Sequence, residues 1–160
     1  MASIGRILNY NPPAERRIPS QVLATWENGI FLKKEDINRD IKGLRSPQIG
    51  AIYATLSHWE VSSDAATIVM PTGTGKTEVM LSLLIAASCY KTMIIVPTDA
   101  LRSQISNKVA SLGLLADPQF SIVKETVLKP IVGVMSHRPA SSEEAIAFME
   151  QCNVVVTTIS

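Results

Sequence analysis

Eight consecutive residues, 70–77, have the composition of a loop that binds phosphate. They read Met-Pro-Thr-Gly-Thr-Gly-Lys-Thr, with two glycines shortly before a lysine and a threonine. Glycine suits such turns because it adopts positive φ and lets the backbone approach a ligand closely. Backbone N–H groups of residues 73–77 would surround a phosphate, Lys76 would place its charge on the outer phosphates, and the Thr77 hydroxyl would ligate Mg²⁺.

One residue departs from the general pattern G-x-x-x-x-G-K-[ST], because Met70 stands where the first glycine is expected. A Gly/Thr-rich turn can also match such a short motif by chance. The flanking sequence favours phosphate binding. Residues 65–69 are an apolar run typical of a buried parallel strand, and residues 78–90 are apolar and free of Gly and Pro, as in a largely covered helix.

A helix over residues 46–60 is predicted upstream of the loop. Ser46 suits the N-cap and Pro47 suits the first helical position. The apolar periodicity predicts one buried face on this helix, made of Ile49, Ile52, Tyr53, Leu56 and Trp59.

Downstream of the loop, residues 92–96 form a second apolar run that is ended by Pro97. A helix is predicted to follow and to stop at Gly113. Its inward side chains are predicted to be Leu101, Ile105, Val109 and Leu112.

The last third of the chain repeats this alternation. Strands are predicted over residues 120–127, 130–135 and 154–157. Ser141 and Glu144 resemble a capping box that opens a helix between the last two strands. The buried face of that helix is predicted to be Ala145, Phe148, Met149 and Cys152.

Strands that alternate with helices predict an α/β domain with a parallel β-sheet flanked by helices. Ligands of such sheets bind at the carboxyl ends of the strands. Residues 71–77, 97–98 and 157–158 are therefore expected to gather at one edge of the sheet.

Residues 1–43 are the least regular part and are predicted to be an N-terminal extension packed on the core. Ser20 could cap a helix whose apolar side chains recur at helical spacing, namely Val22, Leu23, Trp26 and Ile30. This extension holds 8 Lys/Arg and 5 Asp/Glu if Arg45 is counted with it, against 7 and 9 in residues 46–160. We interpret the excess as a solvated surface.

Composition excludes several classes of protein. The 160 residues (17.4 kDa) suffice for one domain with a core, and a net charge of +1 provides no polybasic surface for nucleic acid. The two cysteines lack metal-ligand spacing, so reduced buried thiols are expected. No signal peptide is recognised, and the apolar run over residues 79–90 is shorter than the ~20 residues of a membrane span. A cytoplasmic protein without membrane contact is expected.

Four segments resemble, in order, motifs of superfamily II helicases of the DEAD/DEAH-like and type I/III restriction-translocase-like kinds. Residues 44–48 resemble the L-R-x-x-Q element, and residues 70–77 resemble motif I in the form P-T-G-x-G-K-T, where a small residue replaces the first glycine. Residues 96–104 resemble motif Ia, P-T-x-x-L-x-x-Q, and residues 154–158 resemble the strand of motif Ib or Ic. The resemblance covers residues 44–160.

The resemblance implies a role for each matching residue. Gln48 would read the adenine edge with Arg45 beside it, and Lys76 and Thr77 would be catalytic. The implied nucleotide-binding set is Arg45, Gln48, Pro71, Thr72, Gly73, Thr74, Gly75, Lys76, Thr77 and Glu78. The implied contacts to the sugar-phosphate backbone of nucleic acid are Pro97, Thr98, Arg102, Thr157 and Thr158.

Simpler interpretations remain open for several of these residues. Gln48 could be a polar residue at a helix start, Arg102 and Gln104 could lie on a helix surface, and Thr157 and Thr158 could be ordinary β-branched strand residues. The two histidines and two tryptophans are expected to be structural: His58, His137, Trp26 and Trp59.

The family resemblance also implies the activity. It implies part of a RecA-like P-loop NTPase domain that uses ATP and Mg²⁺, works with a second RecA-like lobe and moves along nucleic acid, with DNA favoured over RNA. The sequence contains no Asp-Glu motif of the Walker B type, so we expect the N-terminal fragment of a first motor domain, which binds ATP weakly and scarcely hydrolyses it. The alternatives are a nucleotide-gated binding module and a P-loop kinase for a small acceptor.

Overall fold

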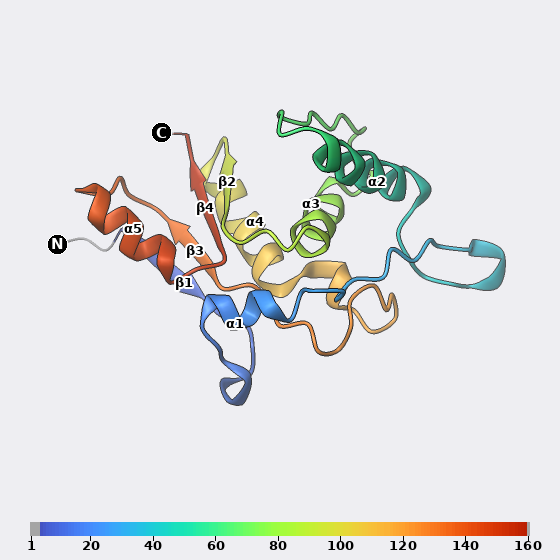
Figure 1. Cartoon of the computed structure of the whole chain (residues 1–160), viewed down its shortest axis with the longest axis horizontal. Coiled ribbons are helices and arrows are strands. Elements are labelled where there is room, and N and C mark those ends of the chain that lie inside the picture. The colour runs from blue at the N-terminus through green and yellow to red at the C-terminus, as the bar shows by residue number, and fades with distance from the viewer. Residues whose placement is uncertain (1–3, 160) are drawn as a thin grey trace.

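The computed structural model describes residues 4–159 and contains a four-stranded sheet, which lies left of centre in Figure 1. The strand order is β1-β3-β4-β2, and the strands are β1 (Gly5–Leu8), β2 (Thr92–Val96), β3 (Val132–Met135) and β4 (Val154–Thr158). The strands β2, β4 and β3 are parallel, as predicted. An antiparallel edge strand, β1, was not predicted, because its residues lie in the irregular N-terminal extension.

The burial of each strand matches its place in the sheet. Val154, Val155 and Val156 of β4 are all buried, as is every residue of β3. A strand covered on both faces reads as an uninterrupted apolar run, which is how these segments were found. The edge strand β2 is less covered, and its Met93 and Ile95 are exposed.

The predicted strand over residues 65–69 is wrong, because this segment belongs to no strand or helix. Its side chains face solvent, with Val69 88% exposed. A β-branched run becomes a strand only where a neighbour accepts its backbone hydrogen bonds. No strand among residues 4–159 pairs with the outer edge of β2 or with this segment.

The predicted strand over residues 120–127 is also wrong. Only one isolated bridge forms there, between Val123 and Ile30. Ser121 adopts a positive φ of 49°, which is incompatible with a continuous strand. The backbone therefore turns at Ser121 and packs against the N-terminal extension instead of joining the sheet.

Most of the helices begin close to their predicted positions along the chain. They are α1 (Pro19–Ala24), α2 (Ser46–Val61), α3 (Lys76–Ala86), α4 (Asp99–Ser111) and α5 (Ser142–Glu150), with short 3-10 turns at Pro13–Glu15, Ile37–Arg39 and Gly113–Ala116. None of the helices in residues 4–159 is long and apolar enough to span a membrane.

Two of the three predicted N-caps are wrong in detail. Ser141 accepts the N–H of Glu144 at 3.2 Å and caps α5, as predicted. Ser46 and Ser20 instead lie inside α2 and α1. A glutamine takes over the capping role at each of these starts, since its side chain accepts the N–H of the residue before the helix.

The N-terminal extension contributes to the same core as the rest of the chain. Val22 and Trp26 are buried in the main apolar cluster with Ile52 of α2 and Val156 of β4. The indole N–H of Trp26 donates to the Leu128 carbonyl at 3.0 Å. The helix predicted to run as far as Ile30 ends at Ala24, yet Trp26 is buried as its apolar spacing suggested.

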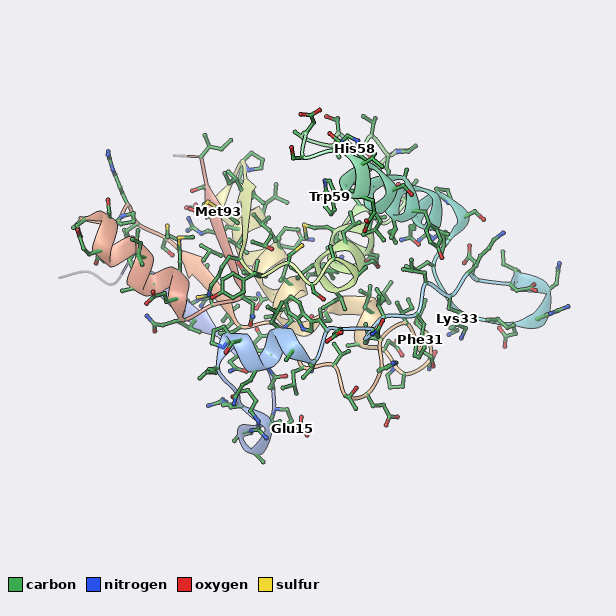
Figure 2. All side chains as sticks on the ribbon, viewed as in Figure 1. Glu15, Phe31, Lys33, His58, Trp59 and Met93 are labelled. Carbon is green, nitrogen blue, oxygen red and sulfur yellow. The ribbon has the colours of Figure 1, made fainter. Side chains whose placement is uncertain are left out.

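The buried face of α2 is narrower than predicted. Its buried residues are Gln48, Ile52 and Thr55, whereas Tyr53 and Trp59 are about half exposed. Trp59 borders an apolar cavity of about 240 Å³ that α2, α3 and β2 enclose. Figure 2 labels Trp59 on α2 and Met93 on β2, the two elements on either side of this cavity.

Candidate nucleotide site

The loop of residues 70–77 has the backbone geometry that its glycines predict. Gly73 and Gly75 have φ of 81° and 85°, and the Thr74 hydroxyl donates to the Pro71 carbonyl at 2.6 Å. A Cβ added to Gly75 would lie 2.1 Å from Nε2 of Gln48, so no other residue fits there without displacing that side chain. Gly75 is also the N-cap of α3, which therefore begins directly at Lys76.

Two side chains from the start of α2 hold this loop in place. Arg45 Nη1 donates to the Gly73 carbonyl at 3.1 Å, and Gln48 Nε2 donates to the Gly75 carbonyl at 3.2 Å. Gln48 Oε1 accepts the N–H of Arg45 at 2.7 Å, and the whole residue is only 4% exposed. In this arrangement the Gln48 amide binds backbone on both of its sides and fixes the loop relative to α2.

The first turn of α3 has N–H groups that no side chain caps. A helix leaves its first N–H groups without intrahelical partners, and no side chain caps α3. Residues of this turn line a cavity of about 680 Å³, a volume within the range of small-ligand sites. Lys76 and Thr77 line this cavity together with Thr72, Gly73, Gly75 and Glu78.

An ion pair between α3 and α4 lines this cavity. Glu78 Oε1 lies 3.9 Å from Lys108 Nζ, which comes from the third turn of α4. Gln104 of the same helix lines the cavity, as do Glu35 and Phe120 from the loops. The sequence pattern did not single out Lys108, Glu35 or Phe120 for this site, because they lie far from the motif and only the tertiary fold brings them near it.

The second group of predicted residues gathers at the carboxyl ends of β2 and β4. Val96 is paired with Thr158, so the loop that follows β2 starts beside the end of β4. Thr98 caps α4 by accepting the N–H of Leu101 at 3.3 Å. Pro97, Thr98, Thr157 and Thr158 are all at least partly exposed on this edge of the sheet.

Arg102 links the start of α4 to this edge. Its Nη1 lies 3.0 Å from Asp99 Oδ1 and donates to Thr158 Oγ1 at 3.4 Å. The side chain is only 12% exposed, and its Nε is buried with no hydrogen-bond partner among residues 4–159. The guanidinium therefore joins α4 to β4.

The phosphate-binding loop and the residues at the ends of β2 and β4 are not brought together at one sheet edge in the way that was predicted. Residues 97–98 and 158 adjoin as expected, because β2 and β4 are parallel and in register. The phosphate-binding loop does not reach this edge through a strand, since residues 65–69 lie outside the sheet. The loop is held by side chains at the start of α2, and Lys108 of α4 pairs with the adjacent Glu78, so α4 is the element shared by the two groups.

Neither cysteine belongs to a metal site. No cluster of three or more His, Cys, Asp or Glu side chains suited to a metal occurs in the described part of the chain. Both thiols are free, and Cys152 is buried as predicted, whereas Cys89 is only partly buried. Burial raises the pKa of Cys152 to about 11 and also raises the pKa of Cys89, so both are neutral thiols at neutral pH.

Comparison with known proteins gives one result. A family model described as "Type III restriction enzyme, res subunit" matches residues 41–160, a range that includes the loop of residues 70–77, both of its α2 partners and the edge formed by β2 and β4. The match confirms the resemblance drawn from the four sequence segments. No curated protein and no solved structure matched the chain.

Proposed function

Because the chain belongs to the type III restriction enzyme, res subunit, family, we propose that it is the ATP-binding domain of a helicase or translocase that moves along DNA. The family is of the ATP-dependent helicase or translocase type. One observation carries the proposal for this chain. The uncapped start of α3, with Lys76 and Thr77 on it, faces a cavity large enough for a nucleotide.

The residues around this cavity fit ATP and Mg²⁺. Lys76 and the first-turn N–H groups of α3 provide the positive charge and donors that bind phosphate oxygens. The Thr77 hydroxyl would hold Mg²⁺, which usually needs few protein ligands because it keeps several waters and bridges phosphates. When bound, the ion neutralises charge on the phosphates. Arg45 and Gln48 fix the loop that presents these groups.

The edge formed by β2 and β4 is proposed to contact the DNA backbone. Thr98, Thr157 and Thr158 lie there, and the start of α4 adds backbone N–H groups. The Thr98 and Thr158 hydroxyls accept from Leu101 and Arg102, and a hydroxyl that accepts one hydrogen bond can also donate one, as to a phosphate oxygen. Such groups position a phosphate backbone without reading bases, which suits a motor that moves along any sequence. ATP-driven closure against a second RecA-like lobe would move the strand across this edge.

Lys76→Ala tests the nucleotide site. We expect the affinity for Mg-ATP, measured by isothermal titration calorimetry, to fall at least about tenfold, since a charge-assisted contact to phosphate is lost. Lys124→Ala is the matched control, because Lys124 is an exposed lysine that does not line this cavity. Unchanged affinity in the Lys76 variant would overturn the proposed nucleotide site.

Thr98→Ala tests the nucleic-acid edge. Loss of the N-cap costs about 1 kcal/mol and frees the start of α4, so we expect weaker binding of single-stranded DNA in fluorescence anisotropy while the ATP affinity is kept. Thr98→Ser retains the cap oxygen and should bind DNA nearly as well as the native chain. An equal loss of ATP and DNA affinity in Thr98→Ala would contradict the assignment of this edge.

A second candidate function is a nucleotide-gated module that holds a protein partner. It is favoured by the exposed Met93 and Ile95 on β2, which has no strand at its outer edge among residues 4–159. DNA-dependent changes in ATP affinity would support the motor. ATP binding that is indifferent to DNA would support the binding module.

A further inference from the structure

A lysine of α4 lies beside the phosphate-binding loop, although α4 starts at the other candidate interface. Lys108 lines the same cavity as Lys76 and Thr77, and its Nζ lies 3.9 Å from Oε1 of Glu78. The helix that places it there is 13 residues long and is capped by Thr98. The position of Lys108 is therefore set by a rigid element and not by a loop.

Glu78 favours a second cation at this place, in addition to Lys76. Its side chain is only 12% exposed, and a Cβ added to Gly75 would lie 2.9 Å from Glu78 Oε2, so the carboxylate lies against the phosphate-binding loop. A nucleoside triphosphate brings several negative charges into the same cavity. Coulomb repulsion from a largely buried carboxylate opposes its binding unless a positive charge is close.

The Lys108–Glu78 pair leaves the lysine free to make a further contact. A separation of 3.9 Å is longer than a hydrogen bond, so the ammonium keeps its donors for other acceptors. The Lys108 side chain is 46% exposed and carries its charge on a flexible stem of four carbons. The Lys108 ammonium can therefore approach a ligand in the cavity while its attraction to the Glu78 carboxylate keeps it on the cavity side of α4.

We propose that Lys108 is a second phosphate-binding cation, which donates to an outer phosphate oxygen of the bound nucleoside triphosphate. This inference rests on the proposed nucleotide site. It adds to that site a residue outside the loop motif, supplied by the helix that also carries Thr98 and Arg102. The nucleotide would then be held between α3 and α4, with Lys76 on one side and Lys108 on the other.

The first experiment compares Mg-ATP with inorganic tripolyphosphate, both measured by isothermal titration calorimetry. Lys108→Ala is expected to weaken both ligands about tenfold, because a contact to phosphate is lost whether or not a nucleoside is attached. Lys108→Arg should retain most of the affinity, and Lys124→Ala all of it. Weakening of ATP alone would overturn the proposal, since Lys108 would then act on the nucleoside.

A double-mutant cycle with Glu78→Gln separates direct contact from charge neutralisation. If Lys108 binds phosphate, Lys108→Ala still lowers the affinity for tripolyphosphate severalfold in the Glu78→Gln background. If Lys108 only offsets the Glu78 charge, the loss disappears in that background, and the proposal is overturned. Thermal unfolding of each variant verifies that the compared proteins are folded.

Failure of this inference and failure of the nucleotide site give different results. If the native chain binds ATP, Lys76→Ala abolishes binding and Lys108→Ala leaves it unchanged, then only the role of Lys108 is wrong. If the native chain does not bind ATP, or if Lys76→Ala has no effect, the nucleotide site itself is wrong.

Discussion

Two buried amide side chains each bond two stretches of backbone, one of them at the sheet and the other at the phosphate-binding loop. Asn153 precedes β4, accepts the Ile131 N–H at 3.0 Å and donates to the Pro19 carbonyl at 2.8 Å. Gln48 on α2 likewise accepts the N–H of Arg45 and donates to the carbonyl of Gly75. Each amide therefore joins two stretches of backbone that no helix or strand ladder connects.

The surroundings of the two amides differ. Asn153 lies beside a ladder of paired strands, and its own backbone bonds Ile131 and Thr92. The loop held by Gln48 has no ladder, because residues 65–69 lie outside the sheet. The sheet thus draws on many backbone hydrogen bonds, whereas the shape of the loop depends on a few side chains. The difference predicts that Asn153 supports global stability and that Gln48 supports ligand affinity.

Asn153→Ala should have the larger effect on stability. It leaves the buried N–H of Ile131 without its acceptor and removes a bond to the Pro19 carbonyl, which costs about 2–3 kcal/mol of unfolding free energy. Urea denaturation measures this loss, and the ATP affinity of the folded variant should be unchanged. Gln151→Ala removes a nearby exposed amide and is expected to change little. A selective loss of ATP affinity in Asn153→Ala would break the comparison.

Gln48→Ala should show the reverse pattern. We expect ATP affinity to fall about tenfold, because the Gly75 carbonyl loses its fixed donor, while the unfolding free energy falls by only about 1 kcal/mol. Gln21→Ala is the matched control, since Gln21 caps α1 through the Ile18 N–H in the same manner and lies outside the cavity. If both glutamine variants retain native ATP affinity, the loop is held by other contacts.

The two cysteine thiols provide a smaller test of the comparison, through the pH dependence of the unfolding free energy. Burial raises the pKa of Cys152 from 9.0 to about 11, so the folded state retains a proton that the unfolded chain loses. Its contribution to stability is full below pH 9 and is lost as the pH rises towards 11. Unfolding free energy should fall by about 1 kcal/mol at pH 10. Cys152→Ala should reduce this fall more than Cys89→Ala, because Cys152 is buried and Cys89, which lines the apolar cavity, is only partly buried.

Local signals in the sequence were sufficient for several elements. Pro97 marks the end of β2, and the Ser46-Pro47 pair marks the start of α2 within one residue. The phosphate-binding loop was identified for the same reason, since its glycines, Lys76 and Thr77 are contiguous. Such features depend on neighbours along the chain, so a pattern in the sequence can show them.

Features that depend on distant neighbours were missed. Residues 65–69 have the composition of a strand but lack a partner strand, and no property of the segment itself reveals this. Trp59 was expected in the core because the pattern of α2 does not indicate how much of the helix is covered. Lys108 reaches the cavity only through the packing of α4, and the roles of the site residues remain predictions.

The uncovered edge of β2 also affects how the protein behaves in concentrated solution. The strand Thr92–Val96 carries no charge and exposes Met93 and Ile95 beside an edge with which no other strand of the described chain pairs. Lys91 and Pro97 flank it, and such residues restrain edge-to-edge stacking of chains. The Lys91 ammonium, however, is engaged by the carbonyls of Met149, Glu150 and Cys152. Self-association into β-rich aggregates should therefore begin at this strand.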